Sequence, residues 1–142
     1  MKITIKNVGG SGQETILADG GSARGTGKSI GPADLRIVGA VNAQVADRLR
    51  ADNAKVYNRG NARTEIAFRV YREFDSELDA EYWLLTHAQS VVREDTVYLD
   101  AQAGNGNTTR VTVSNCVLTL AEISHQGVSV NIAYQITGGA IS

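Results

Sequence analysis

The residues of this chain that could carry out chemistry do not combine into a known catalytic or binding motif. Residues 25–29 have the sequence Gly-Thr-Gly-Lys-Ser, which matches only the end of a phosphate-binding loop pattern. The complete pattern requires a glycine where this chain has Ser22, and a helix must follow so that its N-terminus can hold the phosphate. Gly31 and Pro32 follow here instead. We therefore expect no bound nucleotide and no other cofactor.

The two histidines and the single cysteine are each expected to be structural. His87 and His125 lie on different expected elements, with no acid nearby at metal-ligand spacing, so each is expected to be a surface or satisfied side chain. Ser124 precedes His125 directly, but neighbours on a strand point to opposite faces and cannot form a nucleophile–base pair. Cys116 alternates with leucines and is expected to be a small core side chain. These residues predict no catalytic site, no metal site and no enzyme.

The charged residues also have structural explanations. Asp75, Glu77, Asp79 and Glu81 crowd the first turns of an expected helix, where the helix dipole favours acids. Arginines within residues 59–72 form a modest basic cluster, but acids interleave with them and few aromatic residues accompany them. The 14 basic and 15 acidic residues leave a net charge of -1, so no whole-chain field favours nucleic acid or an anionic membrane. We predict no sequence-specific nucleic-acid binding.

Length and composition indicate an ordinary globular protein. A chain of 142 residues with 42% hydrophobic and 20% charged residues predicts one soluble domain over residues 1–142. No apolar run approaches the ~20 residues that span a membrane, so we expect no membrane contact. Residues 1–6 alternate like a strand and lack the apolar centre of a signal peptide, which predicts synthesis inside the cell.

The clearest local patterns lie between residues 64 and 101. Residues 64–74 alternate like a strand, and alternation resumes at Thr96. Between them the spacing predicts one α-helix over about 76–92, with Ser76 as N-cap and Asp79 at the acidic position of a capping box. The helical face expected to pack on the core comprises Leu78, Tyr82, Leu84, Leu85, Ala88 and Val92.

The remaining segments are expected to be strands, turns and one loop. Residues 9–34 hold many glycines and few large apolar residues, which predicts a flexible loop or arm, with brief pairing at 15–17. Residues 35–41 are apolar enough for a buried strand, while residues 42–53 fit a helix and an exposed ribbon equally well. Turns are expected at 58–61, 104–107 and 126–127, and a bulge or bend at 114–115, where the apolar parity changes. The last strand, expected over 128–136, alternates most regularly.

Together these elements predict a mainly β protein (α+β) of six to eight strands with one helix against them. Antiparallel strands of this kind fold as a β-sandwich or as a partly closed β-barrel. The sequence leaves both arrangements open.

Two features indicate a surface that meets another protein. The last 32 residues carry one formal charge, Glu122, and the side of the last strand opposite its apolar face is neutral and polar. Retained polarity without charge is typical of protein interfaces, although an ordinary exposed Ser/Thr-rich face has the same composition. The neutral candidates for a subunit interface are Ser129, Asn131, Gln135 and Thr137.

The second feature is the helix. Trp83 falls outside its expected core-facing stripe, and His87 lies one turn further on. A tryptophan in that position either is covered by the glycine-rich segment or anchors a neighbouring subunit. Trp83 and His87 are therefore also candidate interface residues.

The order of these elements resembles small structural proteins of tailed phages and prophages, and more loosely the tail-tube fold shared with the inner tube of type VI secretion. The residues that carry the resemblance lie between about 56 and 142: Arg59-Gly60-Asn61, Arg72-Glu73-Phe74, Ala80, Trp83-Leu84-Leu85, His87-Ala88, Tyr134, Gly138-Gly139 and Ile141. It implies a β-structure with one flanking helix that forms rings, typically hexameric, which stack into a tube. It also implies that a long early loop reaches the next ring, a place taken here by the glycine-rich segment with Arg24 and Lys28.

The resemblance and the residues together predict a non-enzymatic structural protein of a phage tail or tail-like particle. Its partners would be copies of itself and other tail or virion proteins, and it would assemble in the host cytoplasm. One alternative is a tail-completion, tail-tip or connector protein that makes a single ring. An alternative of another class is a small carbohydrate- or peptide-binding sandwich that uses the loop at 104–109.

Overall fold

The computed structural model describes residues 1–20, 29–46, 55–139 and 141. Its seven strands form one antiparallel sheet in the order β2-β1-β5-β6-β7-β4-β3, and one helix packs against it. The mainly β class with a single helix is therefore confirmed for the described residues, and the sheet is open, with β2 and β3 at its edges. The elements are β1 (Lys2–Lys6), β2 (Glu14–Ala18), β3 (Ser29–Ala46), β4 (Lys55–Glu73), α1 (Glu77–Ser90), β5 (Glu94–Gln102), β6 (Thr108–Gln126) and β7 (Ser129–Gly138).

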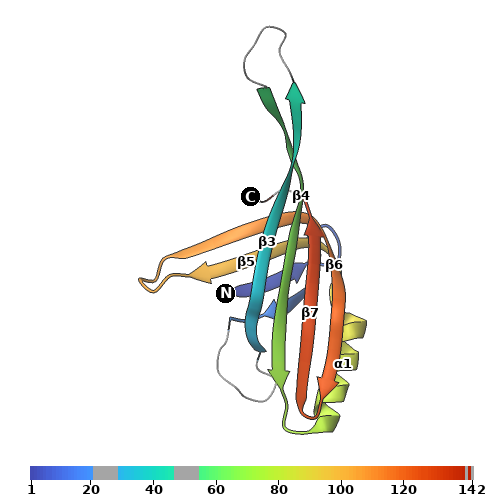
Figure 1. Ribbon diagram of the computed structural model, residues 1–142. Coiled ribbons are helices and arrows are strands. Elements are labelled where there is room, and N and C mark those ends of the chain that lie inside the picture. Colours follow the sequence, from blue (N-terminus) through green and yellow to red (C-terminus); the bar gives the residue numbers. More distant parts are fainter. Residues whose placement is uncertain (21–28, 47–54, 140, 142) are drawn as a thin grey trace.

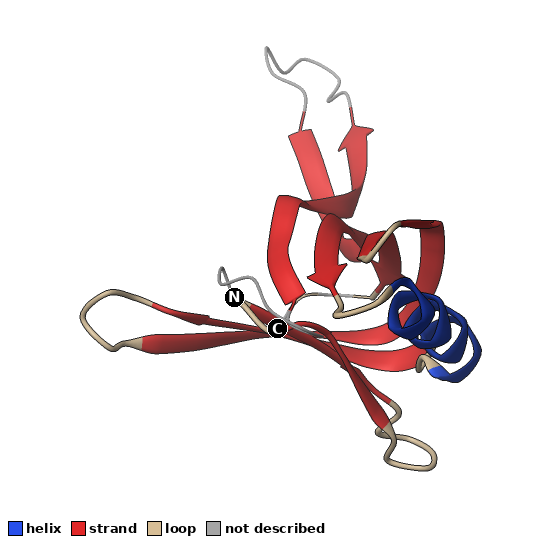
Figure 2. Ribbon diagram, turned by 90° about the horizontal axis from the view of Figure 1, so that it is seen from below, coloured by secondary structure: helices blue, strands red, loops and turns tan. Residues whose placement is uncertain are grey.

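Two hairpins project from the body of the protein in different directions (Figure 1). The ends of β3 and β4 nearest Ala46 and Lys55 extend beyond the other strands, and the β5–β6 hairpin extends to the side. Seen from below, α1 lies against one part of the bent sheet, away from the tip of the β5–β6 hairpin (Figure 2). The predicted turn at 104–107 closes that hairpin, with Gly106 at φ 91° and a hydrogen bond of 2.7 Å from Ala103 N to Asn107 O.

Strand β6 bends the sheet because its two halves pair with different neighbours. Residues 108–117 pair with β5, and residues 117–126 pair with β7. The register to β5 shifts between the pairs Asp95–Cys116 and Val97–Val113, which places two residues, Ser114 and Asn115, opposite the single residue Thr96. Asn115 has φ 56°, in the left-handed region that asparagine tolerates. The bulge predicted at 114–115 is therefore confirmed, and it lets Val113 and Cys116 both face the core.

The core lies on the inner face of the sheet and is dominated by branched aliphatic side chains. Tyr134 is the largest fully buried side chain, and its ring lies 5.2 Å from that of Phe68. Burial of β-branched residues on one face of alternating strands supplies the main stabilising term of such a fold. Its most buried members are Ile3, Ile5, Leu17, Ile66, Val70, Val97, Val113, Val130, Ile132 and Ile136.

The helix begins where the sequence predicts but turns a different face to the core. Ser76 Oγ accepts a hydrogen bond of 3.2 Å from Asp79 N, which confirms the predicted N-cap. The expected core face is wrong in its main members, because Leu78, Tyr82 and Leu85 are 76%, 75% and 68% exposed. The buried helical residues are instead Ala80 and His87, with Trp83 and Leu84 packed partly against the core.

Several segments of the first half also differ from expectation. The predicted loop at 9–34 contains β2, where the brief pairing expected at 15–17 is present, and the start of β3. The turn predicted at 58–61 is wrong, because β4 runs through it and the register to β3 shifts there. The buried strand expected at 35–41 is wrong, because β3 is an edge strand and Ile37 and Val38 are exposed. Of the ambiguous segment 42–53, β3 reaches Ala46, and 47–53 lies outside the described residues.

Gly138 is the glycine whose replacement tests the packing at the bend. It is buried at the end of β7, and a Cβ there would lie 2.6 Å from Cys116 Sγ and 2.6 Å from Val113 Cγ1. We expect Gly138→Ala to lower the free energy of unfolding by about 1–3 kcal/mol through overpacking. Gly39→Ala is the matched control in a strand, because nothing lies within 4 Å of its Cβ position. Urea denaturation of both variants checks this, and equal midpoints would contradict it.

Candidate assembly surface

Trp83 and His87, expected at a subunit interface, lie on the inner side of α1. The indole of Trp83 stacks on the imidazole of His87, with ring centroids 4.6 Å apart and planes 12° apart. The ring of Phe74 lies 5.7 Å from the indole, and the guanidinium of Arg72 lies 4.7 Å from its centroid. His87 is 7% exposed, so its side chain is packed within its own chain, and its contact with a neighbouring subunit stays a prediction. The half-buried Trp83 anchors the helix of its own chain.

A buried hydrogen bond fixes this cluster to the sheet. Tyr134 Oη and His87 Nε2 lie 2.6 Å apart, and both side chains are almost fully buried. Burial, together with the nearby cations Arg72 and Arg93, lowers the pKa of His87 from 6.5 to about 4. Burial also raises the pKa of Tyr134 above its ordinary value. At neutral pH the pair is therefore uncharged, and each polar group satisfies the other.

The outer face of β7 carries the four neutral candidates as predicted. Ser129 and Asn131 are half-buried and Gln135 and Thr137 are exposed, while the alternate residues Val130, Ile132, Tyr134 and Ile136 are buried. The neighbouring strands nevertheless bring charges to this face. Arg69 of β4 and Glu122 of β6 both lie opposite Ala133 and form an ion pair of 3.6 Å across it. Local sequence could not show these charges, because they come from strands that pair over long distances.

Exposed apolar side chains gather in two other places. On the edge strand β3, Ile37 is 42% and Val38 is 45% exposed. On α1, the residues at spacing 78, 82 and 85 form an outward apolar stripe, defined here as Leu78, Tyr82 and Leu85. The three groups on α1 lie together, as is typical of protein interfaces, whereas Ile37 and Val38 are neighbours on a strand and point to opposite faces of the sheet. The candidate inter-ring residues Arg24 and Lys28 lie outside the described residues.

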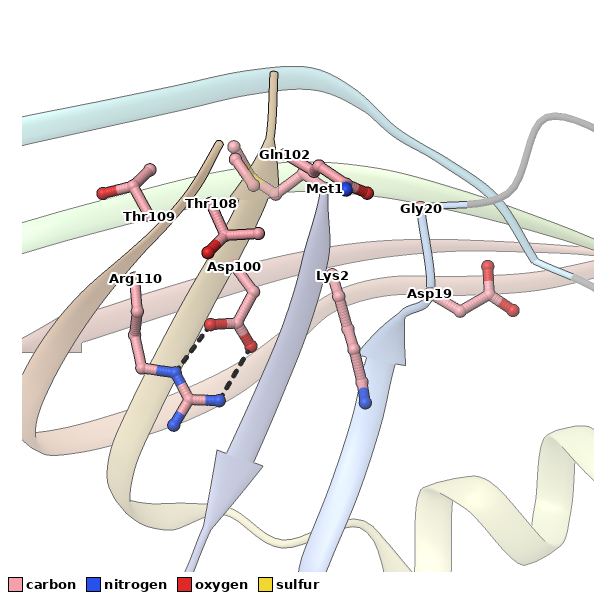
Figure 3. A pocket seen from close by; sticks show the side chains of 10 residues that line it. Met1, Lys2, Asp19, Gly20, Asp100, Gln102, Thr108, Thr109 and Arg110 are labelled. Atoms are coloured by element: carbon pink, nitrogen blue, oxygen red, sulfur yellow. Dashed lines mark hydrogen bonds and ion pairs between the residues drawn. The ribbon is translucent and has the colours of Figure 1, made fainter. Parts of the chain in front are cut away.

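A shallow hollow of about 600 Å³ lies between the start of β1, the end of β2 and the β5–β6 hairpin (Figure 3). Asp100 and Arg110 face each other across neighbouring strands there, with Nε to Oδ1 at 2.6 Å and a second bond of 3.1 Å. This bidentate contact lowers the pKa of Asp100, so its carboxylate is ionised and engaged with the guanidinium. The threonines of the predicted binding loop, Thr108 and Thr109, line the same hollow.

The cysteine lies in the core, as expected. Cys116 is 1% exposed, and its Sγ lies 3.1 Å from Val113 O. Burial raises the pKa of its thiol to about 11, so the nucleophilic thiolate is scarce at neutral pH. Cys116 is therefore a packing residue.

Comparison with known proteins gives no relative from which a function could be transferred. No family model, curated protein or solved structure matches this chain. Within the described residues no helix has the length and apolarity needed to cross a membrane.

The Tyr134–His87 pair makes stability depend on pH in a calculable direction. The folded pKa of His87, about 4, lies below its unfolded value of 6.5, so the unfolded chain binds more protons between them. The stabilisation is complete above pH ~6.5 and is lost as pH falls toward 4, by up to about 3 kcal/mol. Between about pH 7 and pH 4.5, we expect the free energy of unfolding to fall less in His87→Gln than in the wild type. Urea denaturation at both pH values measures this difference. Carboxylates titrate equally in both proteins, so identical losses would contradict this account.

Proposed function

We propose that this chain is a non-enzymatic structural protein that assembles with copies of itself into rings, as a component of a phage tail or tail-like particle. The proposal rests first on the edge strand β3. It has 18 residues, and on its outer side no described strand pairs with it. A long edge strand offers a row of free backbone donors and acceptors to another chain.

The sequence of β3 does not protect this edge over most of its length. Natural edge strands carry charges or prolines that prevent pairing with other chains. Residues 37–46 of β3 contain neither, and Ile37 and Val38 expose apolar side chains there. This unprotected edge is the observation that carries the proposal, because in a monomeric protein it would favour unwanted pairing and aggregation with other chains.

The opposite edge supplies a partner for it. β2 is a five-residue strand at the other end of the sheet, and its Ile16 is 42% exposed. Contact between β3 of one copy and β2 of the next would be heterologous, and a repeated heterologous contact closes into a ring when the rotation allows. The projecting hairpins and the apolar stripe on α1 add surface for contacts between copies or with other tail proteins. A ring of six is what the resemblance to tail-tube proteins implies.

Substitution on the β3 edge tests the proposal. We expect the wild-type protein to sediment as an oligomer and to form rings in negative-stain images. Val38→Lys places a charge in the contact and should weaken self-association by about 10–100-fold, because an unpaired charge is costly to bury. Val128→Lys is the matched control, since Val128 is 41% exposed but lies in the β6–β7 turn, away from both edges.

The outcomes of this experiment are distinct. A wild-type monomer at high concentration, or equal assembly of Val38→Lys and wild type, would contradict the proposal. Rings that do not stack would favour the single-ring alternative, a tail-completion, tail-tip or connector protein, over a tube.

A second candidate function is a small carbohydrate- or peptide-binding module. The hollow beside Asp100 and Arg110 favours it, because polar groups converge there next to the loop at 104–109. A ligand at 100 times its dissociation constant should stabilise the fold by about 2.7 kcal/mol and raise the melting temperature. Arg110→Gln should abolish that rise. Screening of glycans and peptides by thermal melting measures it, and a protein that binds nothing and forms rings would exclude this function.

A further inference from the structure

Three side chains with metal-ligating atoms meet where α1 begins. Glu77 and Glu81 are one helical turn apart and lie on the same side of the helix. His125 comes from the end of β6, one residue before the turn into β7, and Figure 1 shows this end of β6 beside the start of α1. One ligand atom from each of the three lies within 4.8 Å of the other two. The fold thus brings His125 to two residues that lie 44 and 48 positions before it in the sequence.

The imidazole of His125 lacks the hydrogen bond that a buried nitrogen requires. Its Nε2 atom is buried and has no hydrogen-bond partner within the described residues. Oε1 of Glu77 lies 4.0 Å from it, which is beyond hydrogen-bond distance, although the side chain of His125 is only 21% exposed. A buried polar atom without a partner is uncommon, and a water or an ion that binds there is one of its regular explanations.

The two carboxylates add a second reason for a cation. Like charges at positions i and i+4 of a helix repel each other and destabilise it. A cation between Glu77 and Glu81 removes that repulsion and at the same time gives the His125 nitrogen a partner. One ligand therefore satisfies all three groups.

We propose that Glu77, Glu81 and His125 bind one divalent transition-metal ion of the Zn²⁺ class, with water at the remaining coordination positions. One imidazole nitrogen with carboxylate oxygens suits zinc, whereas magnesium and calcium prefer oxygen ligands alone. Metal–ligand bonds of about 2.0–2.2 Å place neighbouring ligand atoms about 3.0–3.5 Å apart. The ligand atoms, now within 4.8 Å of one another, need to come closer together, and Glu77, whose side chain is 64% exposed, has room to move.

The ion would connect the first turns of α1 to the β6–β7 turn. It would therefore hold the first turns of the helix to the sheet, in addition to the Trp83–His87 cluster further along the helix. This inference does not depend on the proposed assembly, because the site lies within one chain.

Calorimetric titration of ZnCl₂ into the chelator-treated full chain tests the proposal. We expect one Zn²⁺ per chain and a rise in melting temperature on binding. Glu77→Gln and Glu81→Gln should each weaken binding by more than about tenfold, since loss of a mere outer-shell partner already costs about 10–100-fold in other sites. His125→Gln should do the same. MgCl₂ in place of ZnCl₂ should give no binding at the same concentration.

Asp79→Asn is the matched control, because it removes one negative charge from the same helix without touching the ligand set. We expect it to bind Zn²⁺ as the wild type does. Both glutamates are exposed, so their variants stay folded and decide the question even where His125→Gln is unstable. Absence of Zn²⁺ binding, a preference for Mg²⁺, or equal binding by wild type and the two glutamate variants would overturn the proposal.

Discussion

The hydroxyl of Tyr134 is buried among the mostly apolar side chains of the inner sheet face, and one helical side chain is positioned to pair with it. A buried hydroxyl without a partner costs about 1–3 kcal/mol. His87 supplies that partner, with its Nε2 atom 2.6 Å from Tyr134 Oη, and the indole of Trp83 stacks on the imidazole of His87. The requirement for this hydrogen bond therefore sets which face of α1 packs on the sheet. The same choice sends Leu78, Tyr82 and Leu85 outward and brings Glu77 and Glu81 beside His125.

Patterns that depend on neighbours in the sequence were predictable. The N-cap at Ser76, the hairpin turn at 104–107, the bulge at 114–115 and the alternation of β7 all follow from local residue types, and all are present. The buried face of α1 was not predictable in this way, because a hydrophobicity count ranks Leu and Tyr above His. Only the position of Tyr134, 47 residues further along the chain, shows that a polar face can be the inner one.

The candidate surface also has features that local sequence predicts and features that depend on strand order. The neutral outer residues of β7 follow from strand alternation, but the Arg69–Glu122 pair beside them depends on strand order, which no local pattern contains. Edge position is a property of the whole sheet as well. Residues 35–41 are apolar, and an apolar run fits a central strand or an unprotected edge equally well. The sheet order decides between them and leaves Ile37 and Val38 exposed.

The bend in β6 lets the core close while the long hairpins extend past it. A flat sheet of long strands would leave both faces open, whereas the bulge at Asn115 turns β5 and the first half of β6 away from the line of β4 and β7. The inner face can then bury its aliphatic residues together with the helix, and the ends of the long hairpins extend past that core. Strands of 18 and 19 residues exceed the usual 3–10 residues of globular proteins. Residues 102–110 of the β5–β6 hairpin are all exposed, so they gain little burial within their own chain. The proposed contact between copies would give strands of this length a physical reason.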